Sequence, residues 1–291
     1  EVLEDVVLEN PFKKHVPVKT ASFVRDDSGT GFVHIAPSLG PDDFYLAREH
    51  HVEVDKTLNA DGTYHSSVPL FAGQHVLHAN GSWGEAQGNV LNYLKENNLV
   101  VALWNDKHST AYSWRSKAPL LYRATKQWFV RVKDGLSEQA DKALNDVNFY
   151  PEDGENRLRS MLDNRPDWCV SRQRSWGVPM ALFVNKDGDV LVDEDVMQKT
   201  LKLFGEHGGD CWYSLDKSTF LGEKYNPDDY EKLMDVLDVW FESGATWSWV
   251  LGETKQADLY LEGSDQHRGW FQSSLLESVA MTGVAPYKNL F

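Results

Sequence analysis

The sequence predicts an α/β protein of more than one domain, on three observations. Its 291 residues exceed the roughly 250 at which a single core usually stops growing. Residues 1–115 mix strand and helix patterns. From residue 236 onward, short apolar strands, a glycine turn and a helix follow one another, as in half of a doubly wound parallel sheet.

Within residues 1–115, turn and capping residues define the expected elements. Residues 16–35 read as strands broken by a turn at 26–29, the later strand being 32–35. Pro41 begins a helix with two aspartates in its first turn. Apolar residues at helical spacing over 90–94 predict a second helix, and residues 99–104 a buried strand.

The rest of the chain is irregular and aromatic-rich up to about residue 235, then regular. In the irregular part, one apolar helix face is marked by Met197, Leu201 and Phe204. Residues 236–241 and 258–261 predict two strands, with a turn at 242–244. The final helix is predicted from Ser264 as N-cap, Gly283 as C-cap, and Phe271, Leu275 and Val279 at a spacing of four. A further strand is expected to start after Pro286.

The composition excludes several classes of protein. With 41% apolar and 25% charged residues, the chain is neither disordered nor fibrous. Twenty-nine Lys and Arg against 44 Asp and Glu give a net charge of −15, so any contact with nucleic acid must be local. No apolar run reaches the ~20 residues of a membrane helix. We therefore expect a cytoplasmic protein without a membrane partner.

Metal and nucleophile motifs are missing from the sequence. The two cysteines, Cys169 and Cys211, form neither a zinc ligand set nor a disulfide framework, and they suit a reducing cytosol. Residues 112–117 carry serines where a metal knuckle needs thiolates, so we expect no zinc and no other metal site. There is also no glycine-rich phosphate loop, serine nucleophile elbow or H-E-x-x-H motif.

The run from Glu262 to Trp270 is the strongest functional signal. It places two carboxylates, an amide and an imidazole at the predicted end of a strand, beside a helix N-terminus that favours anions. Such a set can bind a ligand with hydroxyls, an ammonium group and a phosphate. The alternative is that Ser264 and Asp265 only cap the helix.

A second run, residues 165–177, holds three arginines and two tryptophans in an acidic chain. Guanidinium groups suit phosphates and indole rings suit stacked bases, so the end of a single-stranded nucleic acid is a candidate partner. The alternative is a structural cluster of ion pairs and aromatic rings.

A third run covers residues 29–37 and the aspartates Asp42 and Asp43. An aspartate at the mouth of a pocket could bind a ligand ammonium group, and His34 could hold a ribose hydroxyl or a water molecule. The alternative is a loop in which both aspartates favour the helix dipole.

Three segments together closely resemble the isoleucyl-tRNA synthetases, a family of class I aminoacyl-tRNA synthetases. Residues 169–179, 235–244 and 260–274 occur in the family's order and approximate spacing, and valyl and leucyl enzymes differ more. The resemblance implies that residues 1–115 are the later part of a β-rich inserted editing domain. Residues 116–235 would be connecting segments of the catalytic core, and 236–291 the start of the second half of its Rossmann-like domain.

The resemblance also implies an activity and its partners. The family activates isoleucine with ATP and Mg²⁺, transfers it to tRNA(Ile), and hydrolyses mischarged valyl-tRNA(Ile). The implied partners are isoleucine, ATP and the acceptor end of the tRNA, and we expect a monomer. Since isoleucine exceeds valine by one methylene, worth ~1–3 kcal/mol, a second pocket that admits only valine is needed; this amino-acid pair is the usual example of that figure.

Roles follow from the resemblance position by position. Asp43 would bind the ammonium group of a mischarged amino acid, and His34 would line the editing pocket near the terminal adenosine. The isoleucyl-adenylate would contact Glu262, Gly263, Asp265 and Gln266, with Trp240 and Trp270 flanking the isoleucine side chain. The approach of the tRNA end would be supported by Arg172, Arg174 and Trp176.

The chain also departs from the family. The His-Ile-Gly-His and Lys-Met-Ser-Lys-Ser motifs, which stabilise ATP phosphates in the transition state, are absent, as is a threonine-rich strand of the editing pocket. We expect an internal piece of a longer protein that binds no cofactor and makes no adenylate alone. Glu242 stands where the family often has Asp, and Leu39 where it often has His. A free-standing aminoacyl-tRNA deacylase and a non-catalytic tRNA-binding fragment remain the alternatives.

Overall fold

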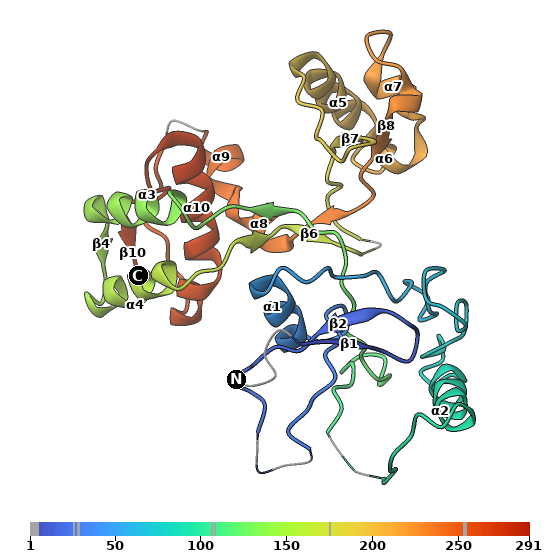
Figure 1. Cartoon of the computed structure of the whole chain (residues 1–291). Coiled ribbons are helices and arrows are strands. Elements are labelled where there is room, and N and C mark those ends of the chain that lie inside the picture. Colours follow the sequence, from blue (N-terminus) through green and yellow to red (C-terminus); the bar gives the residue numbers. More distant parts are fainter. Residues whose placement is uncertain are drawn as a thin grey trace. The chain divides into compact units, whose positions relative to one another are not determined.

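The structure is a computed structural model that describes residues 6–25, 27, 30–105, 107, 109–174, 176–252 and 255–291. The chain divides into two compact units, Glu1–Lys126 and Gln127–Phe291, which are coloured from blue to green and from green to red in Figure 1. The three-part division of the sequence at residues 115 and 235 stays a prediction.

In the first unit, a hairpin and two helices surround irregular chain. Strand β1 (Val7–Glu9) pairs antiparallel with β2 (His15–Pro17). Helix α1 (Pro41–Glu49) begins at the predicted proline, whose missing N–H costs nothing at a first helical position. Helix α2 (Ala86–Glu96) confirms the predicted second helix.

Aromatic packing joins the hairpin to α2. The Phe12 ring, in the turn after β1, stacks on Tyr93 of α2 at 5.7 Å between ring centroids. Phe71 meets both rings edge-on, at 6.0 and 5.9 Å. Three mutually contacting rings therefore supply a local apolar centre.

Two strands predicted in this unit do not form. Residues 32–35 and 99–104 have no strand assignment, and Val101 and Trp104 are 104% and 71% exposed. The apolar runs satisfy strand propensity, but the described residues offer neither of them a partner strand in a ladder. Propensity without a pairing partner does not hold a strand.

The second unit contains short strands that pair across long stretches of sequence. Strand β3 (Phe129–Val130) pairs antiparallel with β5 (Trp168–Cys169), and β6 (Ser171–Arg172) with β9 (Val236–Leu237). Strand β10 (Asn289–Leu290), predicted after Pro286, pairs in parallel with β4 (Asn148–Phe149).

Residues 257–260 lie along the other side of β10. Ala257 bridges to Tyr287 and Tyr260 to Leu290, both in parallel. Parallel pairing on both sides of β10, together with the helices on this unit, agrees with the predicted α/β class. The predicted strand at 258–261 is thus reduced to isolated bridges.

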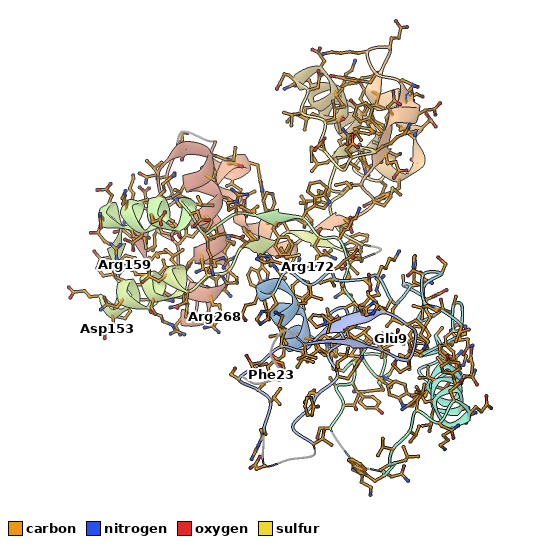
Figure 2. The ribbon with its side chains drawn as sticks, in the orientation of Figure 1. Glu9, Phe23, Asp153, Arg159, Arg172 and Arg268 are labelled. Carbon is orange, nitrogen blue, oxygen red and sulfur yellow. The ribbon has the colours of Figure 1, made fainter. Side chains whose placement is uncertain are left out.

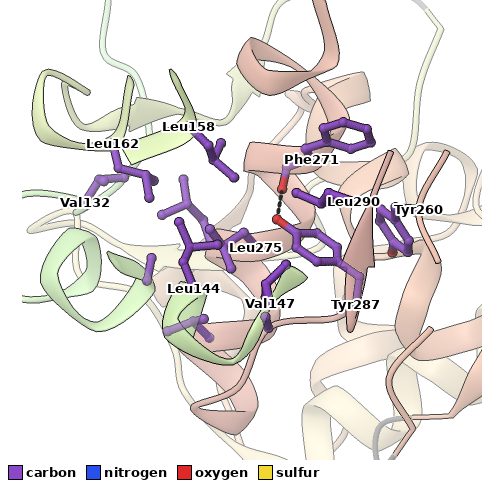
Figure 3. Packing of buried hydrophobic residues seen from close by; sticks show 14 of the residues in the cluster. Val132, Leu144, Val147, Leu158, Leu162, Tyr260, Phe271, Leu275, Tyr287 and Leu290 are labelled. Carbon is purple, nitrogen blue, oxygen red and sulfur yellow. Dashed lines mark hydrogen bonds between the residues drawn. The ribbon is translucent and has the colours of Figure 1, made fainter. Parts of the chain in front are cut away.

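Helices α3 (Leu136–Ala143), α4 (Asp153–Asp163) and α10 (Trp270–Thr282) pack around the main core, with a 3₁₀ turn η1 at Leu144–Asp146. Figure 3 shows Leu158 and Leu162 of α4 facing Leu275 of α10. The Tyr287 hydroxyl donates to the Phe271 carbonyl oxygen at 3.0 Å. Phe271, Leu275 and Val279 are all buried, and Gly283 ends α10 in the left-handed conformation, so the buried face and the C-terminus of this helix were predicted correctly.

A second core lies within residues 181–232. It is formed by β7 (Phe183–Asn185), antiparallel to β8 (Tyr230–Lys232), and by helices α5 (Glu194–His207), α6 (Cys211–Ser214) and α7 (Lys217–Leu221), with a 3₁₀ turn η2 at Pro227–Asp229. Trp212 is fully buried, with Phe183 and Phe220 edge-on at 5.0 Å.

Helix α5 was predicted, but only Phe204 of its three predicted face residues packs on the core, edge-on to Trp212. Met197 and Leu201 are 53% and 61% exposed, whereas Val196 and Thr200 are buried. The Thr200 hydroxyl donates to the Val196 carbonyl oxygen at 2.8 Å, which satisfies it inside the helix. Thr200 could therefore take a core position that the apolar pattern assigned to its neighbour.

Two further predictions near the end of the chain are wrong. The strand predicted over 236–241 stops at Leu237, and helices α8 (Val239–Gly244) and α9 (Thr246–Leu251) follow. Ser264 caps neither helix: it opens a 3₁₀ turn, η3 (Ser264–Arg268), and Gly269 precedes α10.

Candidate functional site

Exposed carboxylates lie where residues 257–260 leave the parallel pairing with β10. The Glu262 N–H still donates to the Phe291 carbonyl oxygen at 3.2 Å, and Gly263 then leads into η3. The side chains of Glu262 and Asp265 are both exposed. This is the carboxyl end of parallel strands, the position at which ligands bind in open α/β sheets.

Gln266 links this loop to α10. Its Oε1 accepts the Trp270 N–H at 2.9 Å, and its Nε2 donates to Asp265 Oδ2 at 3.2 Å. The Gln266 side chain therefore satisfies a free N–H at the start of α10, the capping role that the sequence assigned to Ser264.

Both tryptophans lie next to Gly269, Trp240 in space and Trp270 in sequence. A Cβ atom at Gly269 would be 3.1 Å from two carbon atoms of the Trp240 ring, so the ring approaches the backbone closely. Trp270 stacks on Tyr260 with ring centroids 4.0 Å apart, and its Nε1 donates to the Ser243 carbonyl oxygen at 2.9 Å.

The structure therefore gathers the predicted adenylate residues in one region of the second unit. These residues are Trp240, Glu262, Gly263, Asp265, Gln266 and Trp270. Hydrogen-bonding groups and indole rings lie together there, which suits a ligand with both an apolar and a polar end.

Asp238 organises the chain behind this region and was missed as a functional residue. It is 5% exposed and accepts from Trp168 Nε1 at 3.0 Å and from Arg172 Nη2 at 2.9 Å. It also accepts the Trp240 N–H, which makes it the N-cap of α8. An aspartate directly before the apolar Val239–Phe241 run was the available signal for this cap.

A second guanidinium supports the same cluster. Arg165 lies over the Trp168 ring at 5.2 Å and donates through Nη1 to Gln272 Oε1. Burial lowers the pKa of Arg165 from its usual value, whereas the charge of Asp238 acts in the opposite direction. Two arginines, the Trp168 indole and the Asp238 carboxylate thus form one network next to α8 and α10.

The three residues predicted at the tRNA end have different surroundings. Arg172, labelled in Figure 2, donates through Nη1 to the carbonyl oxygens of Cys169 and Ser171 at 2.7 and 2.9 Å, besides pairing with Asp238. This matches the structural ion-pair alternative. Arg174 is exposed, and Trp176 is 90% exposed.

Replacing Asp238 by alanine should lower the free energy of unfolding by about 2 kcal/mol. Loss of one partner of a buried ion pair costs about 3–5 kcal/mol, and the 37% exposure of the Arg172 side chain reduces that cost. Asp238→Asn keeps an oxygen to cap α8 and should cost less. Urea unfolding measures both, and wild-type stability for Asp238→Ala would contradict the role given to this carboxylate.

The first unit holds the predicted editing residues. Asp43 is half-buried, and its Oδ2 accepts the Ala36 N–H at 2.7 Å, which fixes the loop of residues 36–40. His34 is exposed in the preceding chain, and no hydrogen bond among the described residues joins it to Asp43. One Asp43 oxygen is thus engaged by the loop.

Leu39, in this loop, lines a pocket of about 190 Å³. The lining is almost wholly apolar: Leu39, Leu58, Tyr64, Val76, Leu120, Leu121 and Tyr122. A larger, more polar pocket of about 320 Å³ is lined by Asn59, Asp61, His78 and Arg123, among others. Leucine at position 39 therefore contributes apolar surface where a histidine would place a polar ring.

Glu242, the other departure, accepts the Val178 N–H through Oε1 at 3.0 Å. Over the described ranges, no three His, Cys, Asp or Glu side chains gather as a metal ion would require. Within the same ranges, no helix has the length and apolar character to cross a membrane.

Comparison with known proteins places the chain in a class of enzymes. Residues 9–291 match the sequence model of the tRNA synthetases class I (I, L, M and V), and the chain belongs to this family. The names of its curated relatives are more specific than this family description. The isoleucine–tRNA ligases of Gluconobacter oxydans, Pelagibacter ubique and Vibrio cholerae are 48%, 44% and 44% identical to it over 99% of its length.

The chain spans only about a third of the length of these relatives, with coverage of 32%, 32% and 30% respectively. The match confirms the resemblance drawn from residues 169–179, 235–244 and 260–274.

Proposed function

We propose that this chain is part of an isoleucine–tRNA ligase, in which it supplies the binding wall for the isoleucyl-adenylate. One observation carries the proposal: exposed Glu262 and Asp265 lie at the carboxyl end of parallel strands, next to two tryptophans joined through Gly269. Carboxylates suit the ammonium group and ribose hydroxyls of the adenylate, and indole faces suit its branched aliphatic side chain.

In this proposal each group has a task. Glu262 and Asp265 accept hydrogen bonds from the ammonium group and ribose, and Gly263 lets the ligand approach the backbone. Gln266, held between Asp265 and the Trp270 N–H, keeps the loop in place. Trp240 and Trp270 bound the space for the side chain. ATP and Mg²⁺ are substrates of the whole enzyme, and other parts of such an enzyme would stabilise the phosphates.

We also propose that residues 1–115 belong to an editing domain that hydrolyses valyl-tRNA(Ile). Asp43 would bind the ammonium group through the oxygen that the loop leaves free, and His34 would lie near the terminal adenosine. The apolar pocket beside Leu39 supports this assignment, since it suits a small aliphatic side chain. No side chain is assigned as nucleophile, so the hydrolysis would use a positioned water molecule.

The remaining roles concern tRNA and cellular context. Arg174 and Trp176 are exposed and would support the acceptor end of tRNA(Ile), with Arg172 acting behind them through its pair with Asp238. We further propose that the whole enzyme acts in the cytoplasm as a monomer.

The direct test of this function uses a full-length synthetase that carries this chain. Pyrophosphate exchange measured with each of the twenty amino acids should be fastest with isoleucine. The exchange rate with valine should be about 10–200-fold lower, because valine lacks one methylene. Hydrolysis of valyl-tRNA without any exchange would favour the free-standing deacylase. Binding of tRNA without any chemistry would favour the binding fragment.

A further inference from the structure

The last two residues of α8 are held by one face of α10. The Ser243 carbonyl oxygen accepts from Trp270 Nε1 at 2.9 Å, and the Gly244 carbonyl oxygen accepts from Ser274 Oγ at 2.8 Å. Residues 270, 274 and 277 are spaced by four and three, so their side chains lie on the same face of the helix. The third of them, Glu277, also reaches Gly244.

Glu277 fills the space that a side chain at Gly244 would occupy. A Cβ atom built on Gly244 would overlap the Glu277 carboxyl group, with Oε1 the nearest atom. Gly244 is itself buried. The two residues therefore form a matched pair, in which a missing side chain on α8 makes room for a carboxyl group on α10.

Burying the Glu277 carboxyl group at this position costs folding free energy. Glu277 is 9% exposed, and within the described residues its Oε1 has no hydrogen-bond partner. Burial alone raises its pKa to about 9, so the group is neutral at physiological pH. A buried, unpartnered polar group of this kind is retained against a folding cost, which is typical of residues near functional sites.

The charged groups on the elements around α10 do not account for the raised pKa of Glu277. Those elements carry Glu138, Asp141 and Lys142 on α3, Asp265, His267 and Arg268 on η3, and Glu242 on α8, with none on α9. None of them contributes to the shift in the pKa of Glu277. Burial raises the pKa of the Tyr260 phenol, and the charge of Glu277, when that group is ionised, adds to this rise.

A movement at Gly244 would reach Trp240. Helix α8 has six residues, about 9 Å at 1.5 Å per residue, and it is capped by buried Asp238 at its other end. Trp240 lies in its first turn with its ring against Gly269, the residue before Trp270. The placement of α8 on α10 thus sets the separation of the two rings.

We propose that Glu277 is a positioning residue of the isoleucine pocket, which seats Gly244 on α10 and so sets the gap between Trp240 and Trp270. The inference rests on the proposed function, because it assigns a specificity role within the same site. Glu277 itself does not contact the substrate in this account.

The test replaces Glu277 in a full-length synthetase that carries this chain and measures isoleucine-dependent pyrophosphate exchange. Glu277→Ala empties the space beside Gly244 and should raise the KM for isoleucine about tenfold, equivalent to ~1.4 kcal/mol, with kcat within about twofold. The ratio of kcat/KM for isoleucine to kcat/KM for valine should fall. Glu277→Gln keeps the shape of the neutral acid and should restore the wild-type KM at pH 7.5.

A pH profile separates positioning from simple structural support. If only the neutral acid seats α8, the wild-type KM should rise about fourfold between pH 8 and 9.5, as the protonated fraction of a group with a pKa of about 9 falls. Glu277→Gln should lack this rise, while sharing the titration of the isoleucine ammonium group. Glu138→Gln, on the exposed side of α3, is the matched control and should behave as wild type.

The outcomes distinguish the two proposals. A wild-type KM for Glu277→Ala, or identical pH profiles for wild type and Glu277→Gln, would overturn the role of Glu277. A wild-type protein that does not activate isoleucine would instead overturn the proposed function. If Glu277→Ala does not fold, the comparison of wild type with Glu277→Gln still decides, since both keep the packing.

Discussion

Replacing Glu262 or Asp265 by alanine is expected to reduce isoleucine-dependent pyrophosphate exchange by about 10- to 150-fold for each change, and the double change should abolish it. Each change would remove a charge-assisted hydrogen bond that the carboxylate accepts from the adenylate, worth about 1.5–3 kcal/mol. The measurement is the exchange rate of a full-length synthetase that carries this chain, at saturating ATP.

Stability should hardly change in these variants. Both side chains are exposed, and surface substitutions usually alter the free energy of unfolding by less than about 0.5 kcal/mol. Glu206→Ala, at an exposed carboxylate of α5, is the matched control and should keep full exchange activity. Unfolding of the Glu262 or Asp265 variants, instead of inactivation, would indicate that these carboxylates support the fold and would contradict the binding role.

Replacing Asp43 by alanine should let valyl-tRNA(Ile) accumulate while isoleucine activation stays intact. The ammonium group of the mischarged valine would lose its charged partner, which slows hydrolysis by about 10- to 150-fold. Accumulation follows because the synthetic site alone discriminates against valine by only about 10–200-fold. The assay follows valyl-tRNA(Ile) formed by a full-length synthetase.

Two further variants separate charge from loop geometry. Asp43→Asn keeps an oxygen that can accept the Ala36 N–H, so the loop should stay in place while the charge is lost. It should also accumulate valyl-tRNA. Asp42→Ala, next to it in the first turn of α1 but exposed, should edit normally. Mischarged product at the wild-type level in both Asp43 variants would make the assignment wrong.

The elements predicted well are those whose signals are local. Helix α10 carries Phe271, Leu275 and Val279 at one spacing and ends at a glycine in the left-handed conformation. Helix α1 begins at a proline followed by two aspartates. Each signal is complete within a few residues, so the sequence alone could define the element.

The wrong predictions depend on distant partners. The Val239–Phe241 run has strand propensity, yet Asp238 caps a helix there because Trp168 and Arg172 hold its carboxylate in place. Residues 99–104 have an apolar pattern but no partner strand among the described residues. Contacts with distant residues can therefore override local strand propensity, and so can the lack of a partner strand.

The candidate site was predictable to the extent that it is contiguous. Residues 262–270 carry most of it in one run, and Trp240, which the resemblance had also named, lies against Gly269 of that run. Glu277 could not be found from the sequence, because a glutamate in a helix carries no pattern of its own. Its meaning comes from Gly244, on another helix.

The most direct test is a crystal structure of a full-length synthetase that carries this chain, with a non-hydrolysable sulfamoyl analogue of isoleucyl-adenylate. The account predicts that the analogue's amine and ribose hydroxyls lie within hydrogen-bond distance of the Glu262 and Asp265 carboxylates, with its branched side chain between the Trp240 and Trp270 rings. An analogue bound elsewhere, with those two carboxylates still facing solvent, would contradict it.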